Sequence, residues 1–115
     1  MNEGIGIDIV DINKFKKIIY YSKPNFYEKL FLKSEIDYCL RFKNSAERFA
    51  GKFAVKEAVI KSISGKTSFL DIETSHSNDK PIVKLRNKKQ KYSFLVSISH
   101  EKNFAISVVI SKKIR

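Results

Sequence analysis

The sequence predicts a single α+β domain over residues 1–115, with an N-terminal strand, then helices that include one long central helix, then antiparallel strands. The chain has 115 residues, enough for one hydrophobic core but not for two. Apolar residues recur with the helical period between residues 12 and 63, and with a period of two from residue 67 onward. A strand, then helices, then strands joined by short turns is typical of an α+β domain.

The first strand is predicted over residues 4–10, Gly-Ile-Gly-Ile-Asp-Ile-Val, where residue types alternate. The alternation places three isoleucines on one face. On the other face it places Gly4, Gly6, Asp8 and Val10. Glycine inside a strand weakens it and often marks a place where a ligand or another backbone comes close. We therefore expect open space beside Asp8, which a ligand or another backbone can occupy.

Two helical stretches are expected between the first strand and the central helix. Asp11 is a suitable N-cap for a helix over residues 12–21, because a side-chain oxygen there can accept hydrogen bonds from free amides. A second stretch over residues 25–42 carries apolar residues at helical spacing. It is expected to break where Ser34 can cap a new start.

The central helix is predicted over residues 45–63. Asn44 and Glu47 have the spacing of a capping pair, and Gly65 supplies a stop. At about 100° per residue, the apolar side chains fall on one arc that is expected to face the core. Glu57 lies near the middle of this arc. A carboxylate taken out of water must be paired, well hydrogen-bonded or bound to a cation.

The spacing offers two partners for Glu57. Lys61 lies four residues later on the same arc and could form an ordinary helical ion pair. Asp8 could instead share a hard-cation site with Glu57, because Mg²⁺ is commonly held by one or two carboxylates. The spacing alone leaves both interpretations open.

The C-terminal half is predicted to contain strands rich in Ile, Val and Phe that are separated by polar turns. They cover residues 69–74, 81–86, 92–99 and 104–111. The last two form the clearest hairpin, with residues 100–103 at the turn.

The chain carries a formal charge of +11 at pH 7. A field of this size attracts anions such as nucleic acid, nucleotides or an acidic protein. Nineteen of the 23 basic residues are lysine, so a coding bias toward lysine, isoleucine and asparagine is the alternative explanation.

Three further observations indicate the cellular compartment of the protein. Cys39 is the single cysteine, which excludes an internal disulfide, and we interpret it as a helix-packing residue. No apolar run approaches the ~20 residues that span a bilayer. The chain enters a strand pattern at once, without a basic and apolar leader. We therefore expect a cytoplasmic protein that does not insert into membranes.

Four short segments occur together in an order that matches one enzyme family. They are residues 6–12 (GIDIVDI), 31–36 (FLKSEI), 48–58 (RFAGKFAVKEA, continuing to Lys61) and 96–100 (VSISH). Each segment alone would be weak evidence. Together, and at these spacings, they resemble the holo-acyl-carrier-protein synthases, the small phosphopantetheinyl transferases. The resemblance covers nearly the whole chain and implies a homotrimer with active sites at subunit boundaries.

The resemblance implies transfer of 4′-phosphopantetheine from coenzyme A to a serine of an apo acyl carrier protein, which releases adenosine 3′,5′-bisphosphate and supports fatty acid biosynthesis. Asp8 and Glu57 match the family's metal-binding carboxylates, which hold Mg²⁺, or alternatively Mn²⁺, with a coenzyme phosphate and waters. The metal would neutralise charge on the diphosphate, and a carboxylate-held water could take the serine proton. Lys61 matches a lysine close to the coenzyme phosphates and completes the expected catalytic set.

The same resemblance implies a set of coenzyme-binding residues: Lys52, Lys56, Lys61, Gly65, Pro81 and His100. Lys56 and Lys61 could instead be solvated helix lysines. That explanation suits Lys56 better, because Lys61 lies on the predicted buried arc. His100 could instead be a polar residue that starts a hairpin turn.

A small RNA-binding module is the competing interpretation. It is supported by the charge of +11 and by nine Phe and five Tyr on an α+β frame. The chain has neither the basic-Gly-aromatic segment of sheet-stacking RNA modules nor a Gly-x-x-Gly clamp, and many of its aromatic residues fall at helical spacing. The family resemblance therefore leads us to expect acyl carrier protein, coenzyme A and further copies of the chain as partners, and no nucleic acid.

Overall fold

The computed structural model describes residues 2–114 and contains the elements in the predicted order. These are β1 (Glu3–Asp11), α1 (Asn13–Lys17), α2 (Pro24–Glu28), α3 (Lys33–Leu40), α4 (Ser45–Ser62), a 3₁₀ turn (Phe69–Asp71), β2 (Ile72–Ser77), β3 (Lys80–Leu85), β4 (Lys91–Glu101) and β5 (Phe104–Ile114). The predicted α+β class is confirmed.

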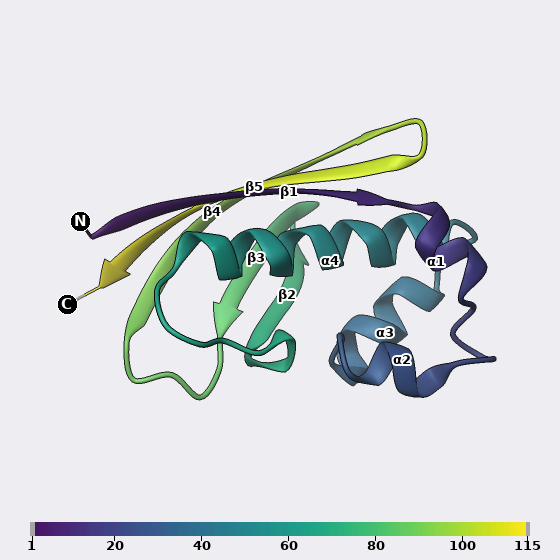
Figure 1. The fold of residues 1–115 in the computed structure, drawn as a ribbon, viewed down its shortest axis with the longest axis horizontal. Helices are drawn as coiled ribbons and strands as arrows, with labels where there is room; N and C mark the ends of the chain where they lie inside the picture. Colours follow the sequence, from purple (N-terminus) through teal and green to yellow (C-terminus); the bar gives the residue numbers. More distant parts are fainter. Residues whose placement is uncertain (1, 115) are drawn as a thin grey trace.

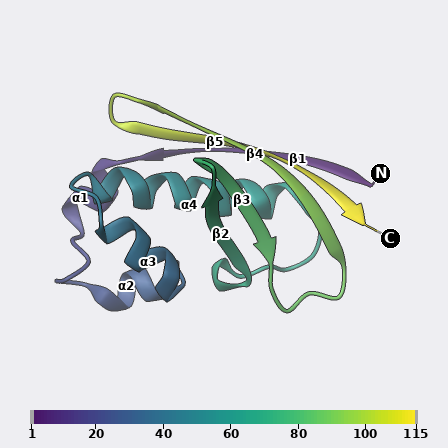
Figure 2. The same cartoon turned by 180° about the vertical axis from the view of Figure 1, so that it is seen from behind.

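The strands form two antiparallel sheets, one in the order β1-β5-β4 and the other a β2-β3 hairpin. Helix α4 lies along one face of the three-stranded sheet and packs mainly against β1 and β5 (Figure 1). Helices α2 and α3 lie below one end of α4, and the β2-β3 hairpin crosses α4 on one flank, with β3 beside β4 (Figure 2). The long helix is thus covered on several sides.

The close contact between β1 and α4 depends on two glycines. A Cβ atom built on Gly6 would overlap the carbonyl oxygen of Ala58, and one built on Gly4 would overlap the carbonyl oxygen of Ser62. The glycine face of β1 is therefore filled by the backbone of α4. Of the two occupants that the sequence suggested, a backbone rather than a ligand takes this space.

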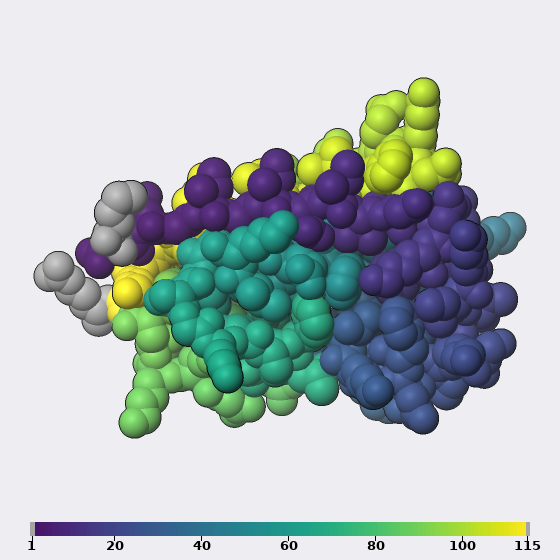
Figure 3. Space-filling view, in the orientation of Figure 1, coloured from purple at the N-terminus to yellow at the C-terminus, as the bar shows by residue number. Residues whose placement is uncertain are grey.

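The opposite face of β1 points away from α4 and is exposed. Ile5, Ile7 and Ile9 are 68%, 62% and 60% exposed. In the space-filling view, side chains of β1 stand out along one edge of the molecule (Figure 3). The predicted alternation of β1 is confirmed, but its large apolar side chains lie on the outer face.

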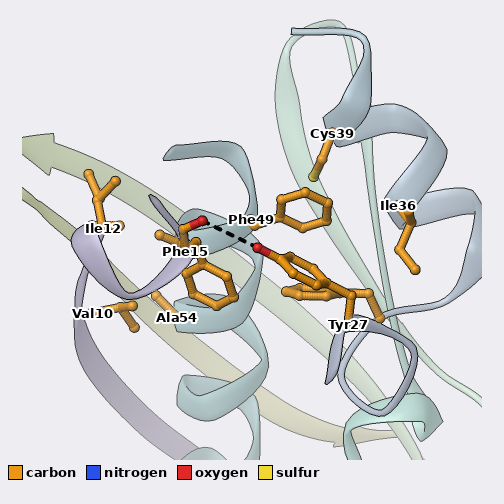
Figure 4. Close-up of a cluster of buried hydrophobic side chains, with 11 residues drawn as sticks. Val10, Ile12, Phe15, Tyr27, Ile36, Cys39, Phe49 and Ala54 are labelled. Carbon is orange, nitrogen blue, oxygen red and sulfur yellow. Dashed lines mark hydrogen bonds between the residues drawn. The ribbon is translucent and has the colours of Figure 1, made fainter. Parts of the chain in front are cut away.

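An aromatic core joins α1, α2, α3 and the first half of α4 (Figure 4). The rings of Tyr27 and Phe49 lie 4.6 Å apart between centroids. The Tyr27 hydroxyl donates to the carbonyl oxygens of Phe15, at 3.3 Å, and Ile18. Burial raises the pKa of Tyr27 to about 12. Cys39 is fully buried in the same core, which confirms its packing role.

A second core lies under the other half of α4. It is formed by Val55, Ala58, Val59, Ile72 and Val109, which come from α4, β2 and β5. Nearly every residue of α4 from Phe49 to Val59 is buried, so the helix is buried around much more of its circumference than one apolar arc would require.

The helices before α4 differ from prediction at their ends. Helix α1 stops at Lys17, so the stretch predicted over residues 12–21 is too long. Asp11 still accepts a hydrogen bond from the Asn13 backbone amide at 2.9 Å. Pro24 begins α2, in keeping with the tolerance of the first helical turn for proline.

Ser34 does not cap α3. The cap residue is Leu32, whose backbone N–H donates a hydrogen bond to Glu35 Oε1 at 2.7 Å. The pair predicted before α4 also behaves differently, because Asn44 bonds to the Glu47 carboxylate through side chains rather than capping the backbone.

The C-terminal strands also differ at their ends. Residues 69–71 form a 3₁₀ turn, so the strand predicted over residues 69–74 begins at Ile72. Strands β4 and β5 extend to Glu101 and Phe104, which leaves a turn of two residues. In residues 2–114, no helix is long and apolar enough to cross a membrane.

Replacing Gly6 with Ala should lower the free energy of unfolding by at least about 2 kcal/mol, because the added methyl group meets the backbone of α4. Urea denaturation measures this change. Gly51→Ala is the matched control, since its nearest neighbour is the His100 side chain at 3.3 Å and a helical Gly-to-Ala change can gain up to about 1 kcal/mol. Equal stability of Gly6→Ala and wild type would contradict the close packing of β1 on α4.

Candidate active site

The packing of β1 on α4 indicates where Asp8 lies along the helix that carries Glu57. Gly4 lies over Ser62, and Gly6 lies over Ala58 beside Lys61. Two residues along the strand, about 6.6 Å, therefore match four residues along the helix, about 6.0 Å. The same step sets Asp8 over the helical turn that carries Glu57.

Lys61 pairs with Asp8. Its Nζ atom donates to Asp8 Oδ1 at 3.1 Å and to the Ile7 carbonyl oxygen at 3.0 Å. The Lys61 side chain is 52% exposed and the Asp8 side chain is 15% exposed. The predicted place of Lys61 on the buried arc is therefore wrong. Glu57 is half-buried and forms no ion pair with any other residue between 2 and 114. The ordinary Glu57–Lys61 pair is therefore not formed.

This arrangement suits a divalent cation of the Mg²⁺ type. The Lys61 ammonium already marks a position beside Asp8 that is favourable for positive charge. The described part of the chain has no group of three or more Asp, Glu, His or Cys that could hold a metal. Two carboxylates are a small ligand set, but Mg²⁺ commonly uses one or two carboxylates and completes its shell with phosphate oxygens and water. Asp8 and Glu57 thus fit such an ion, with water or phosphate oxygens in its remaining positions.

Pro81 and His100 line a groove of about 570 Å³ between β3 and β4. His76, which pairs with Pro81 across the β2-β3 hairpin, lines the same groove. His100 Nδ1 lies 3.7 Å from a carboxylate oxygen of Glu47. No sequence pattern marks His76 as a groove residue, because only the pairing of β2 with β3 brings it beside Pro81.

A smaller cavity of about 40 Å³ lies beside this groove, and Lys52 is one of the residues that line it. The Lys52 side chain is buried, donates to Thr74 Oγ1 at 3.0 Å, and lies 4.8 Å above the Tyr38 ring. Burial lowers the pKa of Lys52. The pKa of His76 is also lowered, first by burial and then by the charges of Lys52 and Arg48.

Lys56 does not behave as the sequence suggested. Its side chain is 0% exposed, and Nζ donates to Glu35 Oε1 at 2.7 Å. Burial lowers the pKa of Lys56, while the neighbouring Glu35 charge opposes this effect. The solvated-lysine interpretation is wrong. In this structure Lys56 also has no surface with which to contact a coenzyme, so the geometry gives it an internal role.

Gly65 lies in an exposed loop three residues beyond the end of α4. Its φ angle is +84°, a conformation that side-chain-bearing residues rarely adopt. No atom of residues 2–114 lies within 4 Å of a Cβ atom built there. Its predicted contact with a coenzyme stays a prediction.

Apart from Lys56 and Gly65, the predicted site residues thus fall into two groups on one chain. Asp8 and Lys61 lie on the β1 side of α4, in register with Glu57. Pro81 and His100 lie on the β4 side. Because β5 separates β1 from β4, the two groups occupy opposite edges of the sheet.

Comparisons with known proteins agree on one family. The model of the 4′-phosphopantetheinyl transferase superfamily matches residues 4–109. The chain is 42% identical to the holo-[acyl-carrier-protein] synthase of Clostridium botulinum strain Alaska E43, over 96% of this chain and 97% of that protein. It is 40% identical to the corresponding protein of Helicobacter pylori, over 92% and 94%.

Solved structures give the same result. The crystal structure of Helicobacter pylori holo-[acyl-carrier-protein] synthase in complex with coenzyme A is similar with a TM-score of 0.78 and 37% identity, over 94% of this chain and 99% of that one. The synthase of Bacillus anthracis in complex with CoA (3′,5′-ADP) is similar with a TM-score of 0.72 and 32% identity, over 95% of each chain.

Replacing Lys61 with Met should tighten the binding of Mn²⁺ about threefold in the absence of any other ligand, because the ammonium no longer competes for Asp8 and an exposed pair is worth less than about 1 kcal/mol. Electron paramagnetic resonance of free Mn²⁺ measures the affinity. Lys66→Met removes an exposed lysine from the following loop and serves as the control. Weaker binding by Lys61→Met would show that Lys61 supports the cation position instead of competing for it.

Proposed function

This chain belongs to the 4′-phosphopantetheinyl transferase superfamily as a holo-[acyl-carrier-protein] synthase, and we propose that it transfers 4′-phosphopantetheine from coenzyme A to a serine of an apo acyl carrier protein. The observation that carries the proposal is the register of β1 on α4, which sets Asp8 over the turn of Glu57 and beside Lys61. The other product is adenosine 3′,5′-bisphosphate. We further propose that the reaction supports fatty acid biosynthesis in the cytoplasm, where a single free cysteine such as Cys39 fits a reducing compartment.

Asp8 and Glu57 would hold Mg²⁺ in this reaction, with Mn²⁺ as a possible substitute. When bound, Mg²⁺ supplies positive charge opposite the negative charge that grows on the diphosphate. In the transfer, the serine oxygen bonds to the phosphorus that carries pantetheine, and the bond to the bridging diphosphate oxygen breaks. A water hydrogen-bonded to a carboxylate oxygen of Asp8 or Glu57 would accept the serine proton. Lys61 Nζ, which is half-exposed beside Asp8, would donate to the departing phosphate.

The coenzyme would extend from this position into a groove like that lined by Pro81 and His100. On a single chain that groove lies at the opposite edge of the sheet from Asp8. A site completed by a neighbouring copy, with Asp8 from one chain and His100 from the next, would bring the two groups together. We therefore propose that the active site lies at a boundary between subunits.

The outer face of the three-stranded sheet supports assembly into a homotrimer. Ile5 pairs with Ile110, and Ile110 pairs with Leu95, so three exposed apolar side chains form a row across β1, β5 and β4. With Ile7 and Ile9 they make a continuous apolar surface. Exposed apolar surfaces of this kind commonly mark protein interfaces.

The RNA-binding alternative is not supported. Sheet-stacking RNA modules present aromatic side chains on the open face of the sheet. Here that face is mostly aliphatic, with Phe104 at one end, while Phe15, Tyr27 and Phe49 pack inside the aromatic core. The surplus of positive charge would instead favour an acidic carrier protein.

Replacing Asp8 or Glu57 with Ala should lower the transfer rate by about a hundredfold or more, because each change removes a ligand of the cation. Mass spectrometry of an apo carrier incubated with coenzyme A and Mg²⁺ measures transfer as addition of the phosphopantetheine arm. Asp37→Ala, which removes an exposed carboxylate from α3, is the control and should keep normal activity. Normal transfer by either site variant, or no transfer by the wild type, would refute the proposed function.

Replacing Ile7 with Glu should dissociate the assembly, because it places a charge in the apolar surface. Sedimentation velocity should give a trimer for the wild type and a monomer for Ile7→Glu. Ile19→Glu, at an exposed position outside the sheet, is the control and should remain a trimer.

An active site shared between subunits can also be tested by mixing two inactive variants. Co-assembled Asp8→Ala and His100→Ala subunits should regain part of the activity that each lacks alone, because some boundaries then combine an intact Asp8 with an intact His100. A fully active wild-type monomer, or the absence of any regain, would contradict the shared-site model.

A further inference from the structure

Four buried polar side chains form a connected cluster beneath α4. Lys52 and Lys56 come from α4, Glu35 from α3 and Thr74 from β2, and each is less than one-tenth exposed. We call these four residues the buried polar cluster. Because the cluster is buried, its members are held mainly by contacts inside the protein.

Glu35 is the central acceptor of this cluster. Its Oε1 atom accepts from Lys56 Nζ and from the Leu32 backbone amide, each at 2.7 Å. Its Oε2 atom accepts from the backbone amide and the hydroxyl of Thr74, at 2.8 and 2.6 Å. Four donors from three segments therefore satisfy one carboxylate, which fixes α3 and β2 relative to α4.

The hydrogen-bonding capacity of Lys56 is also fully used. Besides Glu35, its ammonium donates to the carbonyl oxygen of Leu30 at 2.9 Å and to that of Phe69 at 3.0 Å. An ammonium group has three protons, and each has one acceptor here. The acceptors lie before α3, in α3 and in the 3₁₀ turn, so the lysine is anchored from several directions.

Stability alone does not account for an ion pair in this place. Two buried charges lose their hydration, and a well-packed apolar pair of similar volume is often equally stable or more so. What a charged, fully bonded pair adds is a defined geometry. The residue whose geometry it would define is the next one along the helix, Glu57.

We propose that Lys56 and Glu35 are positioning residues, which hold the α4 turn carrying Glu57 in the orientation that a divalent cation shared with Asp8 requires. Consecutive residues project about 100° apart around a helix, so anchoring Lys56 on one side fixes the direction of Glu57. The contact of Gly6 with Ala58 fixes the same turn from the β1 side. The proposal rests on the metal site of the proposed function.

The test measures Mn²⁺ affinity by electron paramagnetic resonance, without coenzyme or carrier. Lys56→Met should bind Mn²⁺ at least about tenfold more weakly than the wild type, in the range found for residues that orient metal ligands. The double variant Lys56→Met with Glu35→Gln removes both charges, leaves no unpaired carboxylate in the core, and should show the same loss. Thr74→Val keeps the ion pair but removes one donor to Glu35, and should weaken binding about threefold.

Val55→Ala is the matched control. It removes buried methyl groups from the residue next to Lys56 without touching the buried polar cluster. It should destabilise the protein to urea yet leave Mn²⁺ affinity within about twofold of the wild type, because a change of general stability does not alter the direction of Glu57.

Wild-type affinity in a folded Lys56→Met or double variant would overturn the proposal, as would an equal loss in Val55→Ala. If neither Lys56 variant folds, Thr74→Val decides, and unchanged affinity in that variant would overturn it. If Asp8→Ala and Glu57→Ala both fail to weaken Mn²⁺ binding, the proposed metal site itself is refuted.

Discussion

The contact of the β1 backbone with the α4 backbone is the constraint on which the rest of the structure depends. Only glycine fits at positions 4 and 6, because any Cβ atom would meet a helix carbonyl. This contact sets the register in which two strand residues match one turn of helix. The register then places Asp8 over the helical turn that carries Glu57, where Lys61 donates to Asp8. It also turns the isoleucines of β1 outward, where they form the surface proposed to join subunits.

The opposite side of α4 is held by charge rather than by close backbone packing. Lys52 and Lys56 are both buried, and their ammonium groups reach Thr74 and Glu35. Two of the chain's many basic residues therefore act inside the protein, where the Glu35 carboxylate offsets the charge of one of them. A helix fixed on both sides is suited to carry ligands of a metal, because small rotations of such a helix are opposed.

The sequence predicted what depends on local pattern. The alternation of β1, the extent of α4 and the order of strands and helices follow from periodicity. A cation site shared by Asp8 and Glu57, which two acids at unusual positions suggest, stays a proposal. The sequence did not predict what depends on tertiary contacts. Lys56 finds Glu35, which lies 21 residues away, only because α3 packs on α4. Leu32 replaces Ser34 as the cap because Glu35 folds back onto its amide. His76 reaches the groove through the pairing of β2 with β3.

The most direct test of this account is a crystal structure of the protein soaked with Mn²⁺ and coenzyme A, in which anomalous scattering locates the metal. The account predicts one anomalous peak between β1 and α4, bonded to carboxylate oxygens of both Asp8 and Glu57 at about 2 Å, the range typical of small divalent cations. A peak that contacts neither carboxylate, or a structure in which Asp8 and Glu57 point to separate places while the metal binds elsewhere, would contradict it.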